Sequence, residues 1–139
     1  YTMMYRETKL DRYLKQAEHI ADFLTNNPNL PADKIPYWDY NAPGIPNVER
    51  DASAGAIMAS ALIELSGYVN PETGKKYLQV AETQLRSLAS PAYRAKLGEN
   101  RNCILLHSAG SIPGKSEVNV PLTYADYYFI EALMRFKKL

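Results

Sequence analysis

The sequence has very little cysteine. Cys103 is the only one, so the chain cannot form a disulfide bond with itself. The fold therefore does not need an oxidising compartment, although it does not exclude one. We expect Cys103 to be a small buried side chain beside Ile104 and Leu105.

An excess of one charge is also missing. Sixteen Lys and Arg against fifteen Asp and Glu give a net charge of +1, and the longest basic runs are two lysine pairs. Nucleic-acid binding needs clustered basic side chains that displace counterions from phosphates, so we predict no nucleic-acid partner. No apolar run reaches the roughly 18 residues that span a bilayer. We therefore predict no membrane partner and a soluble segment, periplasmic or cytoplasmic.

Several chemical signatures are absent. The chain contains no glycine-rich phosphate loop, no serine nucleophile elbow and no His/Cys cluster at metal-binding spacing. Nucleotide, catalytic-triad and metal chemistry therefore have no support in the residues.

Helical periodicity dominates what is present. Residues Asp11 to Asn26 repeat apolar side chains along one face and precede Pro28, which predicts an amphipathic helix. Residues 51–67 are small on nearly every face, which predicts an inner helix packed on all sides. Residues 75–89 predict a second amphipathic helix after an Asn-Pro turn at positions 70–71.

The C-terminal part adds a third inner helix. Residues 122–139 place tyrosines and then aliphatic side chains along a helix with a basic end. The short apolar run 102–108 is compatible with a strand or a hairpin arm. The predicted class is all-α with, at most, a short β hairpin.

A weak repeat links the two amphipathic segments. The stretches that begin at Tyr13 and Tyr77 share Tyr-Leu, Ala-Glu and a final Leu at matching positions. Each follows a more apolar helix after a short turn, so the unit is an inner helix, a turn and an outer helix. Its recurrence indicates a stacked or closed array of helical hairpins. Because Tyr1 already continues an apolar pattern, we expect the chain to be a fragment.

Two polar loops precede the inner helices, and in a ring of hairpins both open onto one end. The first loop, residues 28–49, holds five prolines and the only tryptophan. An indole face stacks on sugar C–H surfaces and a carboxylate accepts hydroxyl protons, so Trp38 and Asp39 are candidate sugar contacts. The alternative is that Trp38 plugs the end of the ring.

Arg50 and Asp51 stand where this loop meets the inner helix. Asp51 is favoured as a helix cap. The Arg50 guanidinium suits a bidentate grip on a substrate carboxylate, and pairing with Glu49 or Asp51 is an equal alternative.

The second loop, residues 107–121, is rich in hydrogen-bonding groups. His107 is either a ligand contact or a structural histidine. Glu117 either contacts a ligand or pairs with a loop lysine, and of Tyr124 and its neighbours only one or two reach a cavity. The remaining candidates are donors that could equally be a solvated loop tip: Ser108, Ser111, Lys115 and Ser116.

Two stretches carry a resemblance to a known family. They are "YWDYNAPGIPNVERDASAGAIMASALIEL" and "LLHSAGSIPGKSEVNVPLTYADYYFIEALMRFK". They resemble the C-terminal part of glycoside hydrolase family 88, the unsaturated glucuronyl hydrolases. The resemblance implies an (α/α)6 barrel, of which residues 1–139 would be a C-terminal segment completed by a missing N-terminal part.

The resemblance also implies an activity. Such enzymes act on unsaturated oligosaccharides released by polysaccharide lyases and hydrate the vinyl ether double bond of a 4,5-unsaturated uronic acid, without a cofactor. Their catalytic aspartates lie upstream of residue 1, so we assign no catalytic residue here. The related unsaturated rhamnogalacturonyl hydrolases and a non-catalytic helical-repeat binding module remain alternatives.

Overall fold

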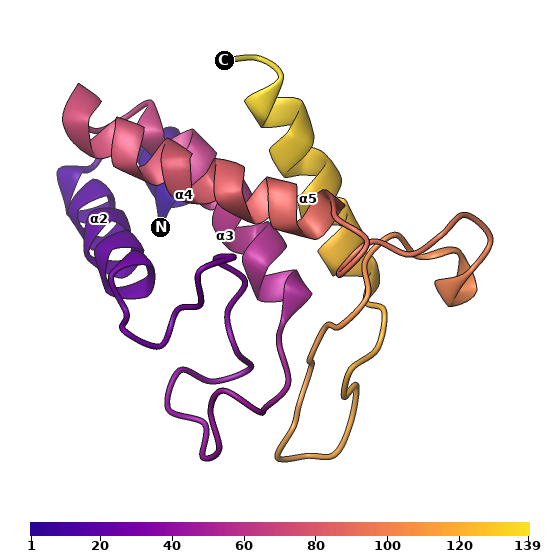
Figure 1. Ribbon diagram of the computed structural model, residues 1–139. Helices are drawn as coiled ribbons and strands as arrows, with labels where there is room; N and C mark the ends of the chain where they lie inside the picture. Colours follow the sequence, from indigo (N-terminus) through magenta and orange to yellow (C-terminus); the bar gives the residue numbers. More distant parts are fainter.

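The computed structural model describes all residues 1–139 and contains five α-helices (Figure 1). No β-strand is present, so the all-α class is confirmed, and the expected β hairpin is reduced to isolated bridges such as Ser108–Val120 and Ser111–Ser116. No helix has both the length and the hydrophobicity needed to cross a bilayer. The elements are α1 (Thr2–Thr8), α2 (Asp11–Thr25), α3 (Ala52–Ser66), α4 (Pro71–Ala89), the 3₁₀ turn η1 (Asn100–Asn102) and α5 (Thr123–Phe136).

Helix α3 is the inner helix of the fold. Ala52, Ala56 and Ala59 have no exposed surface, and buried residues cover most of the helix circumference, whereas Ile57 is 38% exposed. Small side chains let α4 and α5 pack closely on it, because neighbouring backbones can approach where no bulky group intervenes. The expected inner helix is confirmed, but burial on all faces is not, because one side that carries Ile57, Ala61 and Glu64 is only partly covered within the chain.

Helices α3 and α5 run parallel. Ser60 donates a hydrogen bond to Glu131, and Arg135 donates one to Glu64; the partners in both pairs are 71 residues apart in sequence. A constant separation between paired residues requires the same chain direction. The N-terminal ends of the two helices therefore lie at the same end of the molecule.

Helix α4 runs antiparallel to α3 and completes a hairpin with it. Gly74, near the start of α4, lies against Ser66 at the end of α3, where an added Cβ would be 2.7 Å from the Ser66 carbonyl oxygen. Gln84, further along α4, places Nε2 3.8 Å from Sδ of Met58 on α3. Glycine at position 74 is therefore needed for the close approach of the two helices.

The predicted turn at residues 70–71 is wrong, because this pair starts α4 instead. The Asn70 side chain accepts a hydrogen bond of 3.0 Å from the Thr73 N–H, and Pro71 occupies the first turn of the helix. Proline has no N–H to lose there and its φ is already helical. Helix α4 is consequently longer at its N-terminus than the predicted 75–89.

The outer helices α2 and α4 are the repeated segments, and they contact each other. Ala17 and Ala21 are the buried residues of α2, as its periodicity predicts. The Tyr77 hydroxyl of α4 donates a hydrogen bond of 2.9 Å to Asp22 of α2. Burial is the largest cause that raises the pKa of Tyr77, and Asp22 raises it further, so this hydroxyl remains a donor.

Helix α5 buries only one face within the chain. Ala125, Phe129 and Ala132 are buried, whereas three apolar side chains on the opposite face are exposed: Tyr127, Ile130 and Met134. Cys103, expected to be buried, is half-exposed in the segment that precedes this helix, while its neighbour Leu105 is fully buried.

Candidate functional site at the N-terminal ends of the inner helices

The two polar loops meet at the N-terminal end of α3, and Figure 1 shows both extending from the same end of the helices. The backbone N–H of Trp38 donates to the Glu49 carbonyl at 3.0 Å, and the backbone N–H of Asp51 donates to the Pro36 carbonyl at 2.9 Å. Ala52 N–H then donates to the carbonyl of His107 at 3.0 Å. These backbone bonds place Trp38 and His107 on the same end of the molecule.

Asp51 links the two loops through its side chain. As predicted, it caps α3 by accepting a hydrogen bond of 2.9 Å from Ser53 N–H. The same oxygen accepts a second bond of 2.6 Å from the Ser53 hydroxyl and a third of 3.2 Å from Ala109 N–H. The helix cap therefore also fixes the start of the second loop, which the sequence does not reveal.

Asp126, in the first turn of α5, binds the backbone of the segment that precedes His107. Its two oxygens accept hydrogen bonds of 2.7 Å from Ile104 N–H and 2.9 Å from Leu105 N–H. A carboxylate in the first turn also complements the dipole of its own helix. The carboxylate thus satisfies two backbone N–H groups of an irregular segment, and the start of α5 anchors the segment that carries His107.

His107 lies half-buried between the loops. Its Nδ1 is 2.7 Å from Oδ1 of Asn119, and its ring packs edge-on against Tyr93 with a centroid distance of 6.1 Å. The backbone φ of His107 is +62°, a left-handed conformation that is uncommon for a residue with a side chain. The ring orientation is thus set by contacts on two sides.

Arg50 is occupied by partners within the first loop. Its Nε donates a hydrogen bond of 3.0 Å to the Ile35 carbonyl, its guanidinium pairs with Asp33, and it lies 5.0 Å from the Tyr37 ring centroid. The expected pairing with Glu49 or Asp51 is wrong, because the folded loop brings Asp33 to the guanidinium instead.

Tyr93 extends the cluster around Arg50 towards His107. Its hydroxyl donates a hydrogen bond of 3.0 Å to the second oxygen of Asp33. Burial, the largest cause, raises the pKa of Tyr93, so the hydroxyl stays protonated and remains a donor. The first loop is therefore tied to the ring that packs against His107.

The other candidates of the first loop face solvent to different degrees. Trp38 is half-buried and Asp39 is exposed. Asp39 accepts a hydrogen bond of 2.6 Å from Asn41 N–H, which is the geometry of an Asx turn. The indole and the carboxylate are adjacent on the loop that pairs with the start of α3.

The second loop exposes most of its candidates. Ser111, Lys115 and Glu117 are exposed, and Tyr124 retains 41% of its accessible surface. Glu117 does not pair with Lys115; it lies against Gly110, where an added Cβ would be 2.1 Å from its Oε2. Ser108 differs from the others, because it has no exposed surface and its hydroxyl has no partner.

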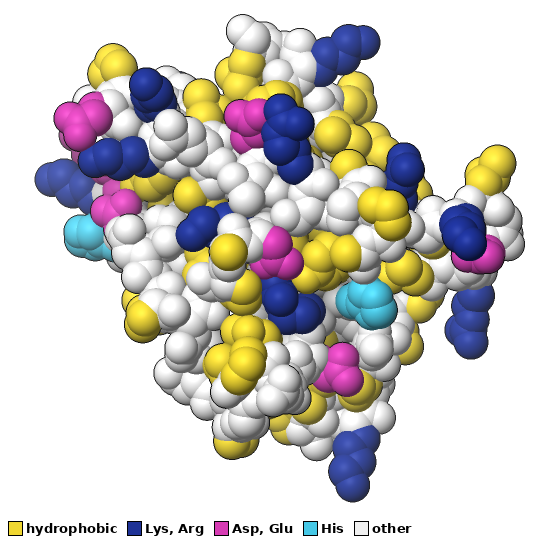
Figure 2. Space-filling model, viewed as in Figure 1, with side chains coloured by type: hydrophobic (Ala, Val, Ile, Leu, Met, Phe, Trp, Pro, Cys, Tyr) yellow, Lys and Arg dark blue, Asp and Glu magenta, His cyan; other side chains and the backbone are white.

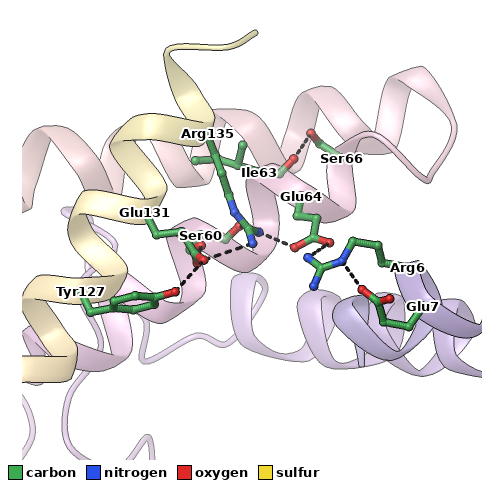
Figure 3. Close-up of polar contacts among 9 residues, drawn as sticks. All are labelled: Arg6, Glu7, Ser60, Ile63, Glu64, Ser66, Tyr127, Glu131 and Arg135. Carbon is green, nitrogen blue, oxygen red and sulfur yellow. Dashed lines mark hydrogen bonds and ion pairs between the residues drawn. The ribbon is translucent and has the colours of Figure 1, made fainter.

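A separate polar cluster lies further along the inner helices (Figure 3). Glu64 of α3 accepts hydrogen bonds from Arg6 of α1 and Arg135 of α5, and Arg135 also lies 3.4 Å from Glu131. The cluster borders a concavity of about 360 Å³ between the three helices. Every charge in it has a partner of opposite sign, so the arrangement fixes the helices relative to one another. Sequence analysis missed this cluster.

The chain presents neither a metal site nor a dominant charge. No group of His, Cys, Asp or Glu side chains has the arrangement of a metal centre. On the face shown in Figure 2, basic and acidic side chains are interspersed, and no large area carries one sign. The end that gathers the two loops offers aromatic and hydrogen-bonding groups.

Two parallel inner helices, an antiparallel outer helix and loops gathered at one end define a segment of an α/α toroid. No family model matches the chain. It is 48% identical over all 139 residues to the unsaturated glucuronyl hydrolase of Formosa agariphila, of which it spans 34%. It is 30% identical over 139 residues to the unsaturated chondroitin disaccharide hydrolase of Streptococcus agalactiae, again over 34% of that protein.

The solved structures that match this chain are also unsaturated glucuronyl hydrolases. A crystal structure of an unsaturated glucuronyl hydrolase specific for heparin superposes with a TM-score of 0.95 at 48% identity, covering the whole of this chain and 38% of that one. A mutant of the S. agalactiae unsaturated glucuronyl hydrolase, complexed with dGlcA-GalNAc6S, superposes with a TM-score of 0.85 at 28% identity, over 97% of this chain and 36% of that one. The chain is therefore similar over its whole length to unsaturated glucuronyl hydrolases, and it spans about a third of the length of these relatives.

Proposed function

We propose that residues 1–139 are the C-terminal segment of an unsaturated glucuronyl hydrolase and supply part of one (α/α)6 barrel. The match to about a third of each relative supports a segment, and the parallel inner helices α3 and α5 are the arrangement that such a barrel requires. The exposed apolar face of α5 is suited to packing against the missing N-terminal part.

The proposed reaction removes a 4,5-unsaturated uronic acid from an oligosaccharide released by a lyase. A proton is added at C4 of the vinyl ether and water at C5, and the resulting hemiketal opens and releases the next sugar. The aspartates that carry out these steps belong to the upstream part. This chain contributes binding and orientation of the substrate, which lower the entropic cost of reaching the reactive geometry.

The observation that carries the proposal is the hydrogen bond from Ala52 N–H to the His107 carbonyl, which joins the two loops at the start of α3. The indole of Trp38 offers a stacking face for a sugar ring, and Asp39 beside it offers acceptors for hydroxyls. His107 and Tyr124 add hydrogen-bonding groups from the second loop and α5.

The other proposed contact residues differ in how accessible their side chains are to a ligand. Ser111, Lys115 and Glu117 are exposed and available to the leaving sugar, and a sulfate on that sugar would suit Lys115. Arg50 would have to contact a ligand while it remains in its ion pair with Asp33. Ser108 is the least accessible candidate, because it is fully buried.

The decisive assay uses the complete protein and an unsaturated glycosaminoglycan disaccharide. Hydration removes the conjugated double bond, so we expect the ultraviolet absorbance of the disaccharide to fall with time. Constant absorbance with a protein that is folded by circular dichroism would refute the proposal and favour a non-catalytic binding module. Faster turnover of a rhamnogalacturonan disaccharide would instead favour the rhamnogalacturonyl hydrolase alternative.

A further inference from the structure

The backbone around His107 is fixed at several points. Leu106 N–H donates to the Tyr93 carbonyl at 2.8 Å, and the His107 carbonyl accepts from Ala52 N–H. Ser108 then pairs with Val120 through two hydrogen bonds of 3.1 and 3.0 Å. The position of the imidazole is therefore determined by the start of α3, by the segment that follows α4 and by the second loop together.

Asn119 fixes the ring itself. Its Oδ1 lies 2.7 Å from Nδ1 of His107, and Asn119 also has a left-handed backbone, with a φ of +53°. An amide oxygen can only accept a hydrogen bond, so this contact requires the tautomer with the proton on Nδ1. In the neutral ring the lone pair is then on Nε2, which has no partner in the chain.

We propose that Asn119 is a positioning residue that holds His107 in the Nδ1–H tautomer and directs its Nε2 to the substrate. This inference rests on the proposed function, in which His107 contacts the sugar. A neutral Nε2 accepts a hydrogen bond from a sugar hydroxyl, and a protonated Nε2–H donates to the carboxylate of a uronic acid. Asn119 itself does not touch the substrate, and it acts through His107.

The charged groups near His107 are bound to other partners and do not orient its ring. Tyr93 presents its ring to His107 and its hydroxyl to Asp33, which is paired with Arg50. The Asp51 carboxylate accepts from Ser53 and from Ala109 N–H. No carboxylate pairs with the imidazole, so a neutral amide sets its orientation.

The test compares Asn119→Leu and Asn119→Asp in the complete protein. Loss of the acceptor in Asn119→Leu lets the ring turn, and we expect a rise in KM of roughly three- to tenfold with a smaller change in kcat. In Asn119→Asp the new carboxylate favours the imidazolium, so the pH at which kcat/KM changes with His107 protonation should rise by about one unit. Asn102→Asp makes the same change at an exposed left-handed position outside the site and should leave both quantities unaltered.

A second readout does not depend on turnover. Nitrogen-15 NMR of histidine-labelled protein, assigned with His107→Gln, should show the Nδ1–H tautomer in the wild type and a mixture in Asn119→Leu. An Nε2–H tautomer in the wild type, or kinetics of both Asn119 variants equal to those of Asn102→Asp, would overturn the proposal. If the wild type turns over no substrate, the proposed function fails, and the NMR spectrum still decides whether Asn119 sets the tautomer.

Discussion

Replacing Glu64 by glutamine tests how the inner helices are held together. The Glu64 side chain is 13% exposed and accepts from Arg6 at 2.9 Å and from Arg135, which are 39% and 25% exposed. Glutamine has the same shape but no charge, and its NH₂ group cannot accept from a guanidinium. The variant therefore keeps the packing of α3 and weakens both interactions.

The expected loss follows from the two partners. A hydrogen bond to a charged group contributes about 1.5 to 3 kcal/mol when it is largely removed from water, which describes the pair with Arg135. The more exposed pair with Arg6 contributes less, because water screens an ion pair at the surface. We expect Glu64→Gln to lower the free energy of unfolding by about 2 to 3 kcal/mol.

Urea denaturation of the complete protein measures this change, and Glu7→Gln is the matched control. Glu7 pairs with the same Arg6, but its side chain is 67% exposed, so its replacement should cost less than about 0.5 kcal/mol. A double-mutant cycle with Arg135→Gln should give a coupling energy of at least about 1 kcal/mol between positions 64 and 135. A loss for Glu64→Gln no larger than that of Glu7→Gln, with no coupling to Arg135, would refute the reasoning.

Further changes test packing, capping, substrate contact and closure of the barrel. Gly74→Ala pushes a methyl group against the Ser66 carbonyl and should lower the free energy of unfolding by about 1 to 3 kcal/mol in urea denaturation; an unchanged midpoint would contradict the close approach. Asp51→Ala should cost about 1 to 2 kcal/mol in the same assay through loss of the cap, with Asp51→Asn nearer to wild type. Trp38→Ala should raise KM for the disaccharide about tenfold and Trp38→Phe much less, whereas equal values would assign Trp38 to packing. Residues 1–139 alone should self-associate in light scattering through their exposed apolar faces, and a stable monomer would argue against a severed barrel.

The helices could be predicted because their signals are local. The small residues of α3 and the apolar face of α2 specify their own burial, and the repeat at Tyr13 and Tyr77 identifies the outer helices. The misplaced start of α4 has a local cause as well. The Asn-Pro pair is compatible with both a turn and a helix start, and packing of Gly74 on Ser66 selects the helix.

The candidate site was predictable in location but not in detail. That two loops leading into parallel inner helices share an end follows from the hairpin pattern alone. The partners of Arg50, Asp126 and Glu64 depend on residues distant in sequence, and single-sequence patterns do not encode such pairs. Asn119 escaped notice for the same reason, because only the folded loop brings it to His107.

A crystal structure of the complete protein with an unsaturated disaccharide tests the central claim most directly, namely that the sugar binds where the two loops meet. We predict that one bound sugar lies within about 4 Å of both the Trp38 indole and the His107 ring. A disaccharide bound instead at the far end of the inner helices, against Glu64 and Arg135, would contradict the account.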